Sequence, residues 1–228
     1  MPLGGERVFK ASFSAWKRAL ESGAIDAFLR RVYGGEHVDV WRRRYEQALT
    51  LFADCYGAVG DLVIARCPGQ INLMGMHIDY GGMPSVRLAV RGADTLTLAR
   101  ANKSDVVRLC SHLYYGGEKV NRFEPFELRL SKIAPTANVG TREALMAYAG
   151  MVCQRRLEQT GSAQNDHWSV LVMGQLVYLE SYFRARIALG GFDALVWSNV
   201  SPSGGMSSSS ALVVSTACAA LGANDLEP

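Results

Sequence analysis

The spacing of apolar positions is helical over the first quarter of the chain. Residues 16–32 and 40–56 each carry apolar side chains three or four positions apart, and this spacing predicts two helices. We expect Asp39 to cap the second helix and Gly57 to end it. The predicted buried face of that helix consists of Trp41, Tyr45, Ala48, Leu49 and Phe52. The run Arg42-Arg43-Arg44 is then expected on its solvated face.

Short apolar segments separated by turn residues follow, and they predict a sheet. The expected strands are 62–65, 71–74, 85–90, 95–100 and 106–110, with Cys67-Pro68-Gly69 ending the first. Helical spacing returns from residue 141, in a stripe that includes Leu145 and Val152, and again over 167–189 after a loop at 160–166. A last strand at 193–199, a serine-rich loop and a helix at 211–221 complete an order typical of an α+β domain with a mixed sheet.

The serine-rich loop is SPSGGMSSSSALVV, residues 201–214. It lies between a predicted strand and a predicted helix, whose first turn has unpaired N–H groups and partial positive charge. Glycines let a backbone approach a phosphate closely, and serine hydroxyls can donate to phosphate or ligate Mg²⁺. The pattern therefore favours a phosphate-binding loop over a linker, with a purely structural capped turn as the alternative. It is neither a GxxxxGK[ST] loop nor a GxGxxG fingerprint.

A second candidate segment is CPGQINLMGMHIDYGG, residues 67–82. His77 and Asp79 are two positions apart, so in extended chain their side chains point the same way and could hold one ligand, with Tyr80 beside them. An Asp–His pair can bind sugar hydroxyls or transfer protons. The alternative is a loop turn closed by Asp79 through its own backbone, with His77 half-buried.

Composition narrows the class of protein without identifying it. The chain has 228 residues and a net charge of +3, which is too weak to indicate a nucleic-acid partner. Five scattered cysteines without a CxxC pair indicate neither a disulfide framework nor a zinc site. The N-terminus has no signal-peptide pattern, and no apolar run approaches the ~20 residues of a membrane span. We therefore expect a cytoplasmic protein without membrane contact, and the sequence leaves the oligomeric state open.

Taken together, the two segments resemble the GHMP small-molecule kinases, and within them the galactokinases. The first galactokinase motif, PGRxNLxGEHTDY, is similar to residues 68–80, and the second, PxGxGLSSSA, is similar to residues 201–210. The resemblance covers roughly residues 40–221, with an unusual insertion around 138–166. It implies the ribosomal-protein-S5-domain-2-like fold of the GHMP kinase N-terminal domain over 40–228, preceded by a helical extension over 1–39.

The resemblance also implies roles for individual residues. The loop around the ATP phosphates would be formed by Ser203, Gly204, Gly205, Met206, Ser207, Ser208 and Ser209. Ser209 falls at the family's magnesium-ligating serine, with Ser208 as the nearest alternative. The positions that contact the sugar would be Met76, His77, Asp79 and Tyr80, where Asp79 accepts hydrogen bonds from a vicinal diol.

Several residues depart from the family pattern. Gln70 replaces the arginine that stabilises charge near the attacking hydroxyl, and Met76 replaces a glutamate that contacts the sugar. Ser201 and Ser203 replace the usual proline and glycine of the second motif. Loss of a cation directed at developing charge can lower a rate by about 10²–10³-fold.

Two functions remain open from the sequence. The first is an ATP-dependent sugar-1-kinase of galactokinase type that uses Mg²⁺, and the second is a non-catalytic sugar or nucleotide sensor. The family's catalytic aspartate and third glycine-rich motif have no counterpart before Pro228. We therefore expect an N-terminal portion that lacks the C-terminal domain and has little turnover alone.

Overall fold

The computed structural model describes most of the chain in nine ranges. They are residues 10–75, 82, 84–115, 118–120, 123–135, 139–160, 168–184, 187–202 and 204–226. The described helices are α1 (Phe13–Glu21), α2 (Asp26–Tyr33), α3 (Val38–Tyr56), α4 (Leu130–Ile133), α5 (Arg142–Thr160), α6 (Trp168–Phe183) and α7 (Ser208–Ala223). The described strands are β1 (Lys10–Ser12), β2 (Asp61–Met74), β3 (Val86–Ala101), β4 (Val106–Tyr115), β5 (Glu118–Val120), β6 (Phe126–Arg129) and β7 (Phe192–Ser198).

The described strands form one mixed sheet in the order β1-β2-β3-β7-β4-β5, with β6 pairing β4 as well. β7 runs parallel to β4 and antiparallel to β3. The expected α+β class and mixed sheet are therefore confirmed. Among the helices of the described ranges, none combines the length and the apolar character that a membrane span requires.

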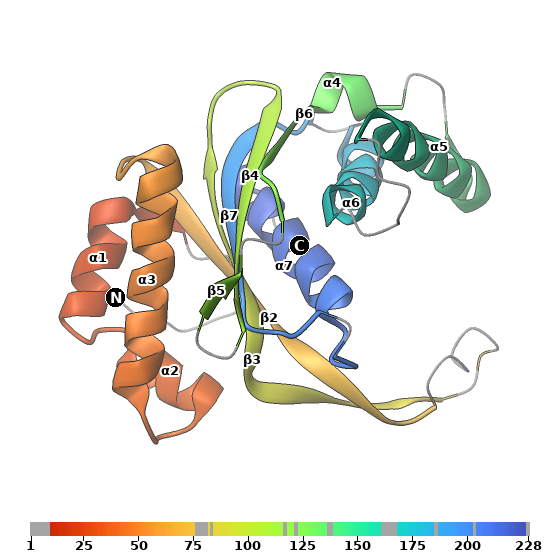
Figure 1. Cartoon of the computed structure of the whole chain (residues 1–228). Coiled ribbons are helices and arrows are strands. Elements are labelled where there is room, and N and C mark those ends of the chain that lie inside the picture. Colours follow the sequence, from red (N-terminus) through yellow and green to blue (C-terminus); the bar gives the residue numbers. More distant parts are fainter. Residues whose placement is uncertain are drawn as a thin grey trace.

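Helices cover both faces of the sheet (Figure 1). One apolar core includes residues of α1, α2 and α3, and a second core includes residues of α5, α6 and α7. β7 serves both cores, because successive strand residues point to opposite faces. Leu195 and Trp197 belong to the core of the first three helices, while Ala194 and Val196 belong to the other. A central strand that is buried on both sides reads as a continuous apolar run, as ALVW does.

The predicted helices are present with shifted ends. The segment 16–32 is two helices, because the chain turns between them at Gly23, whose φ is +71°. α3 begins at Val38 and has His37 as its N-cap, so the predicted cap at Asp39 is wrong, whereas Gly57 ends the helix as expected with φ of +83°. The predicted helix at 167–189 ends at Phe183.

The predicted breaks in the sheet are bulges within two long strands. β2 continues through Pro68, so the expected end at Cys67-Pro68-Gly69 is wrong. Pro68 pairs with Asp94 and Gln70 with Ala89, which leaves residues 90–93 of β3 as a bulge opposite Gly69. Proline is tolerated there because, among the described residues, β1 pairs with Asp61–Val63 alone, so that Pro68 lies on an edge of the described sheet.

The expected insertion at 138–166 contains α5. Ala149 and Val152 of α5 are buried in the core that also holds Val172 and Leu176 of α6. α5 therefore contributes to the packing of the sheet. The loop expected at 160–166 lies almost entirely outside the described residues, apart from the backbone of Thr160 at the end of α5.

Candidate phosphate-binding site

The serine-rich loop joins the buried strand β7 to helix α7. The helix begins at Ser208, three residues earlier than predicted, so three of the four consecutive serines form its first turn. The backbone turns into the helix at Ser207, which is its N-cap and has the left-handed conformation with φ of 53° and ψ of 46°. Gly205 also has a positive φ, of +73°, which glycine adopts without strain.

The first turn of α7 has no side-chain cap. Ser207 makes no capping hydrogen bond through its side chain, although serine is a preferred capping residue. The intrahelical bonding starts with the N–H of Ala211, which donates to Ser207 O at 3.1 Å. A left-handed residue followed by right-handed ones orients successive N–H groups into a concave anion site. The loop therefore ends in backbone N–H groups that can donate hydrogen bonds to an anionic ligand.

The side chains around this turn are accessible. Gly204, Gly205, Ser209 and Ser210 are exposed, and Met206, Ser207 and Ser208 are half-buried. Hydroxyl groups of the first helical turn can therefore reach a ligand together with the backbone N–H groups. Ser203 lies outside the described residues, so its part in the predicted loop stays a prediction.

The two candidate segments meet at the loop. The N–H of Gln70 in β2 donates to the carbonyl oxygen of Met206 at 3.0 Å. Gly69 is buried, and a Cβ there would lie 3.2 Å from Met206 O and 3.2 Å from Val200 Cγ1. Glycine at position 69 thus permits the close approach of strand and loop. The PGQ segment and the serine-rich loop are therefore in direct contact through their described parts.

The remaining residues predicted for the sugar site are not described. Met76, His77, Asp79 and Tyr80 all lie outside the described residues, between the end of β2 and the start of β3 in sequence. Their proposed contacts with a sugar stay predictions. Gln70 is half-buried in β2, beside the loop through its backbone bond to Met206.

A buried charge cluster supports the start of the loop, and the sequence did not predict it. Asp94 is fully buried and forms ion pairs with Arg44 and, at 2.5 Å, with Arg66. Tyr33 donates a hydrogen bond to the same carboxylate at 2.6 Å. Asn199, which leads into the loop, accepts from the N–H of Asp94 at 2.9 Å and from Arg44 at 3.1 Å. Its amide donates to Gly92 O at 2.7 Å, so the end of β7 is held at the bulge of β3.

The prediction that Arg44 lies on a solvated helix face is wrong. Arg44 is 5% exposed and stacks over the ring of Trp197 at 4.1 Å from the centroid. Burial lowers the pKa of Arg44, and the neighbouring Asp94 opposes that effect. Burial also raises the pKa of Tyr45 in this cluster to about 12. With two guanidinium groups around one carboxylate, the cluster carries a net positive charge next to Asn199, where the loop begins.

Two protein-family models match ranges of the chain that contain the two candidate segments. Residues 50–98 match the family model of the galactokinase galactose-binding signature, and residues 171–227 match that of the GHMP kinases N-terminal domain. Together these ranges contain strands β2 and β7 and the serine-rich loop.

Solved structures with similar folds include a galactokinase and a mevalonate kinase. The galactokinase of Lactococcus lactis, crystallised with galactose, has 20% identity and a TM-score of 0.42 over 72% of this chain and 33% of its own. The mevalonate kinase of Methanococcus jannaschii has 17% identity and a TM-score of 0.44 over 72% of this chain and 41% of its own. The chain thus spans between a third and about two fifths of the length of these proteins.

The contact between Gln70 and Met206 joins two segments that separate family models recognise. The galactose-binding signature and the kinase domain therefore describe neighbouring parts of one fold. On these matches residues 171–227 are similar to the N-terminal domain of the GHMP kinases, and residues 50–98 are similar to their galactokinase-like branch.

Proposed function

We propose that the chain binds the phosphates of Mg·ATP at the serine loop and serves the phosphorylation of a sugar hydroxyl. The observation that carries the proposal is the uncapped first turn of α7, preceded by the left-handed Ser207 and held against β2 by the bond between Gln70 and Met206. Backbone N–H groups at such a turn suit an anion, and the helix dipole adds to the attraction. Phosphoryl transfer depends mainly on this kind of positioning and charge stabilisation.

The hydroxyl groups of the loop fit a magnesium ion bound to phosphate. Mg²⁺ prefers oxygen ligands and is usually held by few protein groups together with phosphates and water. Ser209 is exposed in the first turn of α7, and Ser208 beside it is half-buried. We assign Ser209 as the ligand, with Ser208 as the alternative. Bound Mg²⁺ would neutralise charge that develops on phosphate oxygens.

The proposed acceptor is a galactose-like sugar. Support comes from the match of residues 50–98 to a galactose-binding signature and from Asp79, which the sequence motif assigns to a sugar diol. Met76 stands where galactokinases have a glutamate, and methionine cannot hydrogen-bond a hydroxyl well. The sugar is therefore expected to lack, or to present differently, the hydroxyl that this glutamate contacts.

The nucleotide part of the proposal is tested by calorimetry of Mg·ATP with the purified chain. Ser209→Ala should weaken binding of Mg·ATP by about 10–100-fold, an effect of the size expected when a polar contact with a charged group is lost. Ser210→Ala is a matched control, because Ser210 is also exposed and the family motif has alanine at that position. Equal affinities for the two variants would refute the assignment of Ser209. Absence of any binding by the unmodified chain would refute the phosphate site itself.

A second function is favoured by Gln70. This residue sits beside the loop where the family has arginine, and its side chain carries no charge. A protein that binds sugar or nucleotide without turnover would have no need of that arginine. The two functions are separated by measuring ADP release by the full-length protein with a panel of hexoses, pentoses and uronic acids. Sugar-dependent ADP release supports the kinase, whereas binding of a sugar without ADP release supports the sensor.

A further inference from the structure

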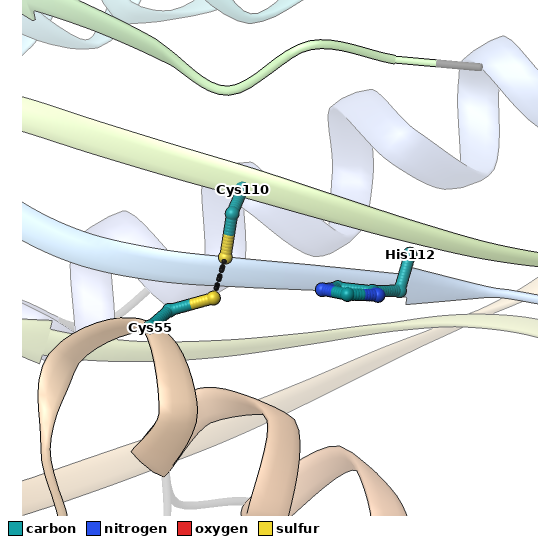
Figure 2. A group of neighbouring side chains, drawn as sticks. All are labelled: Cys55, Cys110 and His112. Atoms are coloured by element: carbon teal, nitrogen blue, oxygen red, sulfur yellow. Dashed lines mark hydrogen bonds between the residues drawn. The ribbon is translucent and has the colours of Figure 1, made fainter. Parts of the chain in front are cut away.

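Three side chains that can ligate a metal converge on the face of the sheet covered by α3. Cys55 lies in the last turn of α3, and Cys110 and His112 lie two residues apart in β4. One potential ligand atom from each residue lies within 4.8 Å of the other two. Figure 2 shows the imidazole of His112 directed toward the two sulfur atoms. Cys55 is exposed, Cys110 is buried and His112 is half-buried.

The fold explains why residues so far apart in sequence meet. Residues 110 and 112 point to the same face of β4, because side chains alternate along a strand. The end of α3 is fixed over that face, since the hydroxyl of Tyr56 donates to Ala194 O of the neighbouring strand at 3.2 Å. Cys110 Sγ then donates a hydrogen bond to Cys55 Sγ at 2.8 Å. The spacing of cysteines in the sequence did not indicate such a group, because no CxxC pair is involved.

The donor set matches the preferences of zinc. Cysteine sulfur and histidine nitrogen bind Zn²⁺ at about 2.3 Å and 2.0–2.1 Å, so ligand atoms in a tetrahedral site lie roughly 3.3–3.8 Å apart. The two sulfur atoms are 2.8 Å apart, closer than that range, and all three ligand atoms lie within 4.8 Å of one another, so a shift of about 1 Å would bring them to tetrahedral spacing. Cys55 can supply the shift, since it is exposed at the end of a helix. Two thiolates would also neutralise the charge of the ion, which lowers the cost of holding it at a half-buried site.

We propose that Cys55, Cys110 and His112 bind a Zn²⁺ ion, with the fourth position open to water on the exposed side of Cys55. The site would tie the end of α3 to β4. It lies apart from the candidate phosphate site, because Cys110 belongs to the core under α1, α2 and α3, whereas α7 packs on the opposite face. His112 pairs in register with Trp197 of β7, two residues before Asn199.

Binding of the ion must displace thiol protons. Burial raises the pKa of Cys110, and the hydrogen bond to Cys55 acts in the same direction, so this thiol is protonated at neutral pH without metal. Thiolates are the metal-binding form, and coordination releases their protons. Metal binding therefore exchanges the hydrogen bond between the two sulfur atoms for two metal–sulfur bonds.

The test uses the full chain, reduced with a phosphine that does not bind zinc and freed of metal by a chelator. We expect one equivalent of Co²⁺ to give thiolate-to-cobalt charge-transfer absorption and the intense visible bands of tetrahedral coordination. Zn²⁺ should displace Co²⁺ stoichiometrically and raise the melting temperature. Cys55→Ser should reduce Zn²⁺ affinity by more than about 100-fold, the upper end of the cost of losing an outer-shell partner of a ligand.

Controls separate the site from non-specific binding by thiols. Cys153→Ser changes a half-buried cysteine outside the proposed site, whose thiol donates to Val170 O, and should leave affinity unchanged. His112→Gln should retain the charge-transfer band, because both cysteines remain, and should weaken the affinity. Equal loss in Cys153→Ser and Cys55→Ser would overturn the proposal. So would a fully reduced chain that gives no thiolate-to-cobalt absorption with Co²⁺, because the two thiols would then not bind metal.

Discussion

The N–H of Gln70 donates to the carbonyl oxygen of Met206 at 3.0 Å, across 136 positions of sequence (206 − 70). This bond joins the strand of the first glycine-rich segment to the loop of the second. The approach is close because Gly69, beside Gln70, has no side chain to separate the two backbones. The geometry of the candidate phosphate site therefore depends on β2 as well as on α7.

Gly69→Ala should disturb the loop and the stability of the chain. The added Cβ would lie 3.2 Å from both Met206 O and Val200 Cγ1, which forces the loop to move. We expect a loss of about 1–3 kcal/mol in the free energy of unfolding, as for other overpacked sites. Mg·ATP affinity should fall with it. Urea denaturation and calorimetry measure the two effects.

Gly150→Ala provides the matched control for that substitution. Gly150 is exposed within α5, and a Cβ there would have no neighbour within 4 Å. Alanine in a helix interior is favoured over glycine by roughly 0.5–1 kcal/mol, so this variant should be slightly more stable with unchanged nucleotide affinity. Similar losses in both variants would show that the loop does not depend on Gly69.

Gln70→Arg should raise the rate of phosphoryl transfer if the chain serves a kinase reaction. The substitution restores a cation beside the loop, where the family has arginine, and a cation directed at developing charge can contribute up to about 10²–10³-fold in kcat. The gain should appear in kcat rather than in KM. Gln70→Met, which keeps the length and removes the polar group, should show no gain. A change in KM alone would mean that position 70 acts only in binding.

Arg44→Met and Arg43→Met should differ sharply although the residues are adjacent. Arg44 is buried against Asp94, and its removal leaves a buried carboxylate with one partner fewer. Breaking such a pair costs about 3–5 kcal/mol. Arg43 forms an exposed pair with Asp39 at 2.7 Å, whose loss should cost no more than about 1 kcal/mol. The test is the free energy of unfolding of each variant, measured in urea. Equal values would contradict a stabilising role for the buried cluster around Asp94.

The Asp26–Arg42 pair should contribute to stability on the acid side. A side-chain hydrogen bond from Arg42, at 3.0 Å, lowers the pKa of Asp26 below its usual value. Because the folded pKa is the lower one, the contribution is present above the unfolded pKa of about 3.9 and is lost as pH falls through the folded pKa. Asp26→Asn should therefore lose less stability than the unmodified chain between about pH 5 and pH 2. Parallel profiles for the two proteins would show that the pair does not act in this way.

The sequence predicted where helices and strands lie better than it predicted how far each strand continues. Helical spacing located α3 and the buried face of Tyr45 and Phe52, because that face depends on neighbours three and four positions away. Proline and glycine at 68 and 92 indicated breaks, yet long-range pairing carries both strands past these residues. A bulge opposite Gly69 accommodates the extra residues, and nothing local to the sequence distinguishes it from a turn.

Charge and metal-ligand clusters were the least predictable features. Arg44 stands in a basic run that is typical of a solvated face, and only the fold brings Asp94 and Arg66 to it. The position of Asp94 in β3 could have suggested this cluster. Asp94 directly precedes the buried residues 95–99, so a buried aspartate that needs a charged partner could have been expected there. Likewise Cys55 and Cys110 meet through tertiary packing, which the spacing of cysteines does not encode.

The place of β7 in the sheet has a consequence for how the chain folds. β3 and β4 are consecutive in sequence, but β7 lies between them and pairs with both. During synthesis, the edges of β3 and β4 that pair with β7 therefore stay unpaired until residues 192–198 have left the ribosome. Such non-local pairing slows folding and exposes strand edges meanwhile. The sheet is accordingly expected to close late in folding, and a chaperone that covers strand edges would benefit the chain most before β7 has been synthesised.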